Sequence, residues 1–315
     1  MTESVVLGRH KMDLFGIYDM TAEEILNVLT TVKTMKYILG QPTKTAPHLQ
    51  GKTVVMLFYE TSARGKLSFE MAARHLSANV IDMTNSLLSK DISELQDTGE
   101  LVDQMGADFI ILRHPMAGAP NLLAKNVKAS VINAGDGFNE NPGQSLLDML
   151  TIQEQKKDFE GLKVAVIGDI AHSRVSKSNI WALGKLGAEI RASGPSTLLP
   201  YEIEKMGVEV FYDAREAVNN ADVVLTSRVH TDSQNKDLIP SMAEYKNFFR
   251  IDEALMRYAK KDAIVMHPGP VRRGIEISAE VMKSPQCIVN DQVSNSVAVR
   301  MAMLYSLSQL GGVTW

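Results

Sequence analysis

The sequence predicts an α/β protein with two parallel-sheet α/β domains of similar size, linked by helices, and an active site in the cleft between them. Three observations support this prediction. Short apolar runs recur along the chain, helical patterns separate most of them, and 315 residues exceed the usual size of a single hydrophobic core. Short apolar strands that alternate with helices are typical of parallel sheets covered on both faces.

The first predicted helix covers residues 21–37. Thr21 and Glu24 have the spacing of a capping box, and apolar residues follow them at helical spacing. Further helices are predicted at 145–155, 178–186, 214–220 and 291–315. The predicted strands are 53–58, 79–83, 109–113, 130–134, 164–168, 189–193, 208–212, 223–227, 264–267 and 287–290.

A polar link divides the chain near residues 150–162, where a helix gives way to QKKDFEGLK and then to a new strand. The last helical pattern is long enough to return to the first half of the chain. We therefore expect one domain from residues 1–147 together with 291–315. The second domain would cover residues 148–290.

Composition excludes several classes of function. A net charge of −4 gives the chain no basic field, so neither nucleic acid nor an acidic membrane is expected as a partner. The single cysteine, Cys287, rules out an internal disulfide framework and is expected to be a buried thiol. No apolar run approaches the roughly 20 residues of a membrane span. The first residues do not read as a secretory signal, so a cytoplasmic location is expected.

Residues 58–70 read FYETSARGKLSFE and lie where a predicted strand leads into a helix. Helix N-termini attract phosphate through unpaired N–H groups and the helix dipole. Ala63 and Gly65 would let an anion approach the backbone, Ser62 offers a hydroxyl, and Arg64 and Lys66 add charge. The alternative interpretation is a solvated turn that contains two cations.

Three more arginines follow predicted strands: Arg113, Arg174 and Arg228. Taken singly, each is explained as a surface charge. The carboxyl ends of parallel strands meet at one edge of a sheet, where ligands bind in open α/β folds. Together with Arg64, these arginines predict a cleft suited to phosphate on one side and to a dicarboxylate on the other.

Other chemistries find little support in the sequence. The histidines that follow strands do not form ligand pairs at helical spacing, so no metal site is expected. Gly168 follows a strand, but no G-x-G-x-x-G pattern comes after it. There is no convincing covalent nucleophile, and no cofactor is expected.

The motifs together resemble one family. FYETSARGKLSFE, RHPMAGAP, NAGDGFNENPGQSLLD, GDIAHSRVSKSN, SRVH, HPGPVRRGIEI and QVSNSVAVRMAML are similar in order and spacing to catalytic chains of the aspartate carbamoyltransferase family. The resemblance extends from about residue 12 to residue 311. It implies transfer of the carbamoyl group of carbamoyl phosphate to the amino group of L-aspartate, in pyrimidine biosynthesis, without cofactor or metal.

The resemblance also implies roles for individual residues. The residues implied to bind carbamoyl phosphate are Ser62, Ala63, Arg64, Gly65, Arg113, Asn141, Gln144 and Pro268. Those implied to bind aspartate are Lys90, Arg174, Arg228, His230 and Gly269, with Ser86 and Lys90 supplied by a neighbouring subunit. The implied catalytic residues are Arg64, Arg113, Asn141 and Gln144. The implied assembly is a homotrimer with shared active sites, which regulatory or dihydroorotase chains can extend.

Two departures from the family pattern fall on the same part of the site. The usual S-T-R-T-R reads S-A-R-G-K here, and the usual H-P-T-Q reads N-P-G-Q. Gly65 and Asn141 thus replace two donors to the carbamoyl oxygen, each commonly worth about 3 kcal/mol. His230 also stands where glutamine is usual. These changes leave two alternatives open: a carbamoyltransferase with another acceptor, or a catalytically weakened homologue that serves as a structural or regulatory partner.

Overall fold

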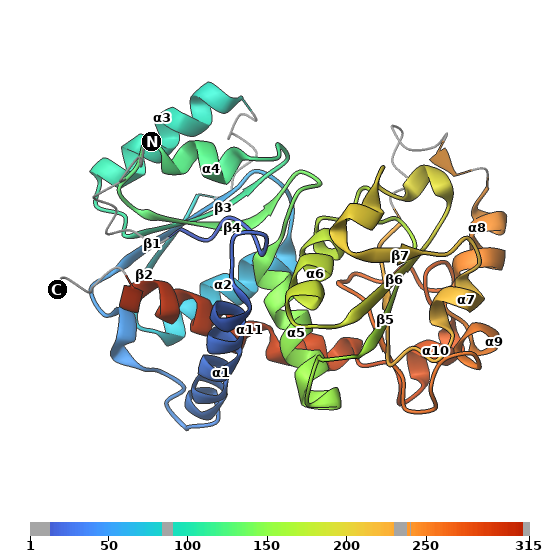
Figure 1. Cartoon of the computed structure of the whole chain (residues 1–315). Helices are drawn as coiled ribbons and strands as arrows, with labels where there is room; N and C mark the ends of the chain where they lie inside the picture. The colour runs from blue at the N-terminus through green and yellow to red at the C-terminus, as the bar shows by residue number, and fades with distance from the viewer. Residues whose placement is uncertain (1–12, 84–90, 230–237, 240, 311–315) are drawn as a thin grey trace, which may run out of the picture. The chain divides into compact units, whose positions relative to one another are not determined.

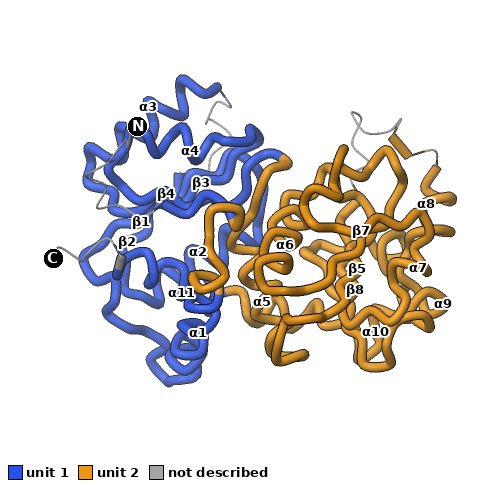
Figure 2. Tube along the Cα trace, in the orientation of Figure 1, with its two compact units in different colours: residues 1–16, 26–137, 297–315 blue, residues 17–25, 138–296 orange. Residues whose placement is uncertain are grey.

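The computed structural model describes residues 13–83, 91–229, 238–239 and 241–310. The chain forms two compact units, coloured separately in Figure 2. Unit 1 contains residues 1–16, 26–137 and 297–315, and unit 2 contains residues 17–25 and 138–296. The predicted domain boundary at residue 147 lies ten residues after this division and remains a prediction.

Unit 1 is built on a four-stranded parallel sheet with the order β2-β1-β3-β4. The strands are β1 (Thr53–Phe58), β2 (Asn79–Asp82), β3 (Phe109–His114) and β4 (Ser130–Asp136). The inner strands β1 and β3 are almost wholly buried, as expected for a sheet covered on both faces, whereas the edge strand β2 is largely exposed. Register pairs Phe58 with Arg113, so β1 and β3 end together.

Unit 2 contains a five-stranded parallel sheet with the order β7-β6-β5-β8-β9. Its strands β5, β6 and β7 are labelled in Figure 1. The strands are β5 (Lys163–Ile167), β6 (Glu189–Ser193), β7 (Val208–Val210), β8 (Val223–Thr226) and β9 (Ile264–Met266). Apolar side chains from β5, β8 and β9 form a buried cluster with helices that follow in the chain. Burial of these three strands therefore fixes the positions of the loops at their carboxyl ends.

The described residues contain eleven helices, of which α1, α5, α6, α7 and α11 correspond to predicted helices. They are α1 (Ala22–Leu39), α2 (Ala63–His75), α3 (Ile92–Gln104), α4 (Ala119–Ala124), α5 (Pro142–Lys156), α6 (Arg174–Lys185), α7 (Ala214–Val218), α8 (Met242–Phe249), α9 (Glu253–Met256), α10 (Ala279–Lys283) and α11 (Val289–Leu310). Short 3-10 turns are η1 (Pro47–Leu49), η2 (Ser196–Leu198) and η3 (Ile203–Met206). The capping box before α1 is confirmed: Glu24 N–H donates to Thr21 Oγ1 at 3.2 Å, and Thr21 N–H donates to a Glu24 carboxylate oxygen at 2.7 Å.

One predicted strand is wrong. Residues 287–290 make a single bridge, between Val265 and Cys287, and α11 already begins at Val289. Ile288 and Val289 are apolar because they are buried where the chain enters α11 beside β9. A run of so few apolar residues is compatible with either a strand or a helix entry. Among the described residues, no helix is long and apolar enough to cross a membrane.

Candidate functional site

The first candidate region is the junction between β1 and α2. Ser62 is the N-cap of α2, and its side chain makes no capping hydrogen bond. The N–H groups of Ala63, Arg64 and Gly65 have no acceptor among the residues that the structure describes. A Cβ at position 65 would lie 2.7 Å from Ser62 Oγ, so glycine leaves room for this hydroxyl over the first turn. The junction therefore presents three N–H groups and a hydroxyl to an anion.

Cations and carboxylates surround this junction in unit 1. Arg113, at the end of β3, donates to the Ala134 carbonyl at 3.2 Å and lies 3.4 Å from a Glu60 carboxylate oxygen. Lys66 pairs with Asp82 at 2.5 Å. Arg64 is exposed and has no ion pair among the described residues. Of these cations, Arg64 has the guanidinium that is most readily available to a phosphate group.

The loop before α5 contains the second group of predicted site residues, in unit 2. Asn141 is the N-cap of α5, and its Oδ1 accepts from the Gln144 N–H at 3.2 Å. Gln144 is half-buried, and its Nε2 donates to Asp148 Oδ1 at 2.9 Å. Each side-chain amide therefore has one end occupied. Asn141 keeps its Nδ2 donor, and Gln144 keeps its Oε1 acceptor.

A buried carboxylate anchors the same loop. Glu140 is 5% exposed and accepts from Ser178 Oγ, and Ser178 Oγ in turn accepts from the Asn141 N–H at 2.9 Å. The N–H groups of Ile17 and Tyr18 donate to the same carboxylate at 2.8 and 3.0 Å. The backbone of Asn141 is therefore held from within unit 2. Glu140 was not predicted, because nothing in the sequence around Glu140 distinguishes it from a surface loop residue.

Two of the predicted arginines follow neighbouring strands of the unit 2 sheet. Arg174 is the first residue of α6, after β5, and Arg228 comes shortly after β8. The Ser173 side chain caps α6 by accepting from the Ser176 N–H at 3.1 Å. The Arg228 Nε is buried and has no hydrogen-bond partner among the described residues. Both guanidiniums are half-buried at the carboxyl ends of strands that pair with each other.

The loop after β9 is organised by a carboxylate that the sequence analysis did not single out. Glu276 is fully buried and accepts from the Val229 N–H at 2.9 Å and from the Arg272 N–H at 2.7 Å. It also lies 2.9 Å from His267 Nε2. Because His267 Nδ1 accepts from the Gly269 N–H, the ring proton is on Nε2 and is donated to Glu276. The one sequence feature that could have indicated a buried carboxylate is the position of Glu276 between two isoleucines.

That loop contains Pro268 and Gly269, two of the predicted binding residues. Gly269 has φ +72°, a left-handed conformation that favours glycine. His267, the last residue before the pair, donates its N–H to Gln292 Oε1 at 3.1 Å. This hydrogen bond to α11 holds the start of the loop. The predicted residues Ser86, Lys90 and His230 lie outside the described residues.

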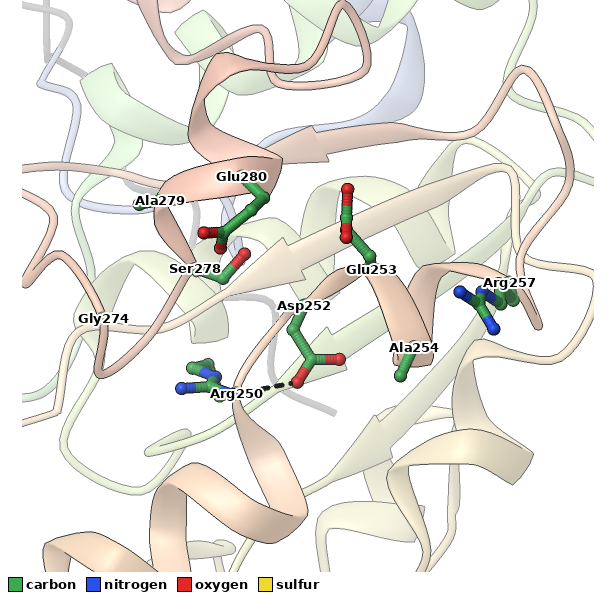
Figure 3. Close-up of a pocket in the computed structure, with 9 residues that line it drawn as sticks. All are labelled: Arg250, Asp252, Glu253, Ala254, Arg257, Gly274, Ser278, Ala279 and Glu280. Atoms are coloured by element: carbon green, nitrogen blue, oxygen red, sulfur yellow. Dashed lines mark hydrogen bonds and ion pairs between the residues drawn. The ribbon is translucent and has the colours of Figure 1, made fainter.

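Unit 2 contains a cavity of about 480 Å³ that none of the predicted site residues line. Figure 3 shows the side chains that line it. Three of its charged groups, Arg250, Asp252 and Glu280, already have structural partners. Arg250 pairs with Asp252 at 3.1 Å, and Asp252 and Ser278 cap α9 and α10. Hydrogen bonds to its own backbone N–H and to Ser278, with nearby Arg250, lower the pKa of Glu280. The cavity is a poor candidate for catalysis.

Comparison with known proteins places the whole chain in one family. Residues 12–154 match the carbamoyl-phosphate-binding domain of aspartate/ornithine carbamoyltransferases, and residues 160–307 match their aspartate/ornithine-binding domain. The chain belongs to the aspartate/ornithine carbamoyltransferase family. This membership confirms the resemblance drawn from the motifs and makes the chain a carbamoyltransferase of two parallel-sheet α/β domains.

Relatives within the carbamoyltransferase family are similar over nearly their full length. The catalytic subunit of aspartate carbamoyltransferase from Acetivibrio thermocellus is 55% identical over 94% of this chain and 96% of the relative. The subunit of that name from Ruminiclostridium cellulolyticum is 54% identical over 95% and 96%. Among solved structures, ornithine carbamoyltransferase from Pyrococcus furiosus has a TM-score of 0.84 at 30% identity, covering 98% of this chain and all of that one.

A second solved structure contains a ligand of interest. Aspartate transcarbamoylase from Trypanosoma cruzi, in complex with N-(phosphonacetyl)-L-aspartic acid, has a TM-score of 0.81 at 27% identity and covers 94% of this chain and 95% of that one. That ligand joins a phosphonate to an aspartate. It therefore combines, in one molecule, the two charged groups that a donor and an acceptor would present to this family.

Proposed function

We propose that this chain is the catalytic subunit of an aspartate carbamoyltransferase, which forms N-carbamoyl-L-aspartate and phosphate for pyrimidine synthesis. The observation that carries the proposal is the orientation of two side-chain amides. Among the described residues, Asn141 Nδ2 has no acceptor and Gln144 Oε1 has no donor. A carbamoyl group has the complementary pair, a carbonyl oxygen and an amino group.

The donor phosphate would bind at the N-terminus of α2. Three N–H groups, Ser62 Oγ and Arg64 are available there, and Arg113 would exchange Glu60 for the phosphate. The acceptor amine then attacks the carbamoyl carbon, a C–N bond forms, and the carbonyl oxygen becomes negative. Asn141 Nδ2 would stabilise this oxygen, which replaces part of the donor set lost at Gly65. The C–O bond to phosphate breaks, and the departing phosphate can accept the amine proton.

Aspartate is the acceptor that the charges of unit 2 favour. Arg174 and Arg228 follow adjacent strands, and each guanidinium can bind one carboxylate. Ornithine has one carboxylate and a cationic side chain, so one of these guanidiniums would face a like charge. The two relatives at 54–55% identity are both named as catalytic subunits of aspartate carbamoyltransferase, whereas the solved ornithine enzyme is 30% identical and the solved Trypanosoma cruzi aspartate enzyme is 27% identical.

We further propose a cytoplasmic homotrimer whose subunits share active sites. The relatives are named as catalytic subunits, which supports an assembly of several chains. Leu67 and Met71, one turn apart on α2, are 58% and 40% exposed, and Ile81 on the edge strand β2 is 49% exposed. Apolar side chains exposed together in this way are typical of a surface that another chain covers.

A panel of acceptors tests the function. Purified protein with saturating carbamoyl phosphate should release phosphate with L-aspartate and form N-carbamoyl-L-aspartate, with turnover far above that for L-ornithine. Product with another amino acid and none with aspartate would favour the altered-acceptor alternative. No product with any acceptor, and no gain from the double substitution Gly65→Thr with Asn141→His, would instead favour a structural or regulatory homologue.

A further inference from the structure

The carboxylate of Asp148 is the centre of a buried network that the proposed mechanism has not yet used. Asp148 is 1% exposed and lies one turn after Gln144 on α5. Three amide nitrogens from three helices donate to it: Gln144 Nε2 at 2.9 Å, Gln292 Nε2 at 2.7 Å and Asn179 Nδ2 at 2.8 Å. A group that accepts from several N–H donors is suited to the ionised, acceptor-only form.

The network fixes which end of each amide faces the carboxylate. A carboxylate has no hydrogen to donate, so a neighbouring amide must turn its nitrogen towards it. For Gln292 the choice is confirmed at the other end, where Oε1 accepts from the His267 N–H at 3.1 Å. For Gln144 the consequence is that Oε1 points away from Asp148. This oxygen has no hydrogen-bond partner among the described residues.

We propose that Asp148 is a specificity-determining positioning residue, which holds Gln144 so that the site accepts a transferable group with an N–H donor and disfavours an isosteric group without one. This inference rests on the proposed function, in which Gln144 faces the carbamoyl amine. Carbamoyl phosphate and acetyl phosphate differ there by an amino group in place of a methyl group. With acetyl phosphate, Gln144 Oε1 stays unpaired in a closed site, which costs the full hydrogen bond.

If Asp148 were absent, the Gln144 amide could turn over. Its Nε2 would then face the transferable group and repel an amine, while a methyl group would be little affected. The preference for carbamoyl over acetyl transfer should therefore fall, even if both reactions also slow for structural reasons. The ratio of the two kcat/KM values isolates this effect, because intrinsic donor reactivity is the same for every variant.

The first test compares Asp148→Ala with the wild type. Transfer to L-aspartate is measured with carbamoyl phosphate and with acetyl phosphate, and N-carbamoylaspartate and N-acetylaspartate are quantified separately. The wild type should prefer carbamoyl phosphate by a factor on the order of a hundred or more. In Asp148→Ala this ratio should fall about tenfold or more. Should the alanine variant not fold, Asp148→Ser takes its place, because a hydroxyl that both donates and accepts does not fix the orientation of Gln144.

Two further variants separate positioning from packing. Asp148→Asn should keep the ratio, because its oxygen can still accept from Gln144 Nε2. Its new amide nitrogen can donate to Asn179 Oδ1, which is buried without a partner among the described residues. Asn295→Ala removes buried contacts of 3.2 and 2.8 Å from α11 to Thr151 and Glu154, on the same helix as Asp148, and should also keep the ratio.

The outcomes are distinct. A wild type that makes no N-carbamoylaspartate would refute the proposed function. An active wild type whose ratio survives in Asp148→Ala or Asp148→Ser would overturn the role of Asp148 and leave the proposed function standing. A ratio that falls as far in Asn295→Ala as in Asp148→Ala would show that general loosening of α5, and not the carboxylate, sets the preference.

Discussion

Asn141 combines two tasks in one side chain. Its Oδ1 caps α5, and in the proposed function its Nδ2 would donate to the carbamoyl oxygen. Asn141→Asp separates the tasks, because aspartate is an equally good N-cap but has no N–H to donate. We expect kcat for N-carbamoylaspartate formation to fall about a hundredfold or more. The melting temperature should stay near that of the wild type.

Asn141→His is the matched control for this prediction, because an imidazole restores an N–H donor of the kind usual in the family. It should keep kcat well above that of Asn141→Asp. An aspartate variant within threefold of wild-type kcat, at saturating substrates, would show that Asn141 contributes only as a cap.

Replacing Tyr245 by phenylalanine should stabilise the protein. Its hydroxyl is fully buried and has no hydrogen-bond partner among the described residues. Burial, reinforced by Glu276 and Asp169, raises the pKa of this phenol well above its usual value. Tyr245→Phe removes an unpaired buried hydroxyl worth about 1 kcal/mol. We expect a higher melting temperature, by roughly 2–4 °C for a unit of this size.

Tyr245 also makes the stability of the folded protein depend on pH. The folded protein keeps the phenolic proton at pH values where the unfolded chain, with a pKa near 10, has lost it. Titration of Tyr245 therefore leaves the free energy of unfolding unchanged below about pH 10. It lowers the free energy of unfolding as the pH rises further, because only the unfolded chain loses the proton. In thermal melts from pH 8 to 11, Tyr245→Phe should lose less stability than the wild type. A variant that melts lower at pH 8 would mean that the hydroxyl has a partner.

Single residues also mark the limit of sequence-based prediction. The arginines and the amides could be singled out because each stands in a motif after a strand or at the start of a helix, and their roles remain predictions. Asp148 and Glu276 could not, because their importance comes from donors far apart in the chain: Gln292 is 144 residues from Asp148, and Val229 is 47 residues from Glu276. No local pattern reveals which acidic residues will be buried together with such donors.

At the scale of elements, Glu276 ties the loop after β9 to the segment that contains Arg228. Glu276→Ala would leave the Val229 and Arg272 N–H groups and the His267 ring without their acceptor. We expect a loss of about 3 kcal/mol in the free energy of unfolding. Because Val229 adjoins Arg228, KM for aspartate should rise about tenfold, or 1.4 kcal/mol. Denaturant unfolding and steady-state kinetics measure the two effects.

Glu204→Ala, an exposed position in the same unit, is the control and should change neither quantity. If Glu276→Ala lowered stability without changing KM, the carboxylate would support the loop but would not position Arg228.

The strands were predictable because parallel strands buried on both faces are short, apolar and bounded by turns. The nine strands of the two sheets all lie within or beside predicted runs. The tenth run, 287–290, was wrong because apolar residues at a helix entry have the same composition as a strand. Small differences at the ends of strands follow from pairing partners, which the sequence alone does not give.

At the scale of the whole molecule, the two-sheet α/β fold and family membership were predictable from motif order, because the family determines both together. Motif order does not give the residue at which the chain divides into units. The contacts of Glu140 and Ser178 bring residues 138–147 into unit 2, and such long-range contacts are invisible in a window of sequence. That a neighbouring subunit supplies Ser86 and Lys90 remains a prediction.

The central claim of the proposed function is that the phosphate site proposed at the N-terminus of α2 and the arginines that follow β5 and β8 act on one pair of substrates. Binding of N-(phosphonacetyl)-L-aspartate to purified protein, measured by calorimetry, tests it most directly. We predict one site per chain with submicromolar affinity. Arg64→Ala and Arg228→Ala should each weaken binding about a hundredfold, since each removes a charged contact worth roughly 3 kcal/mol. Absence of binding, or affinity that depends on only one of these arginines, would contradict the claim.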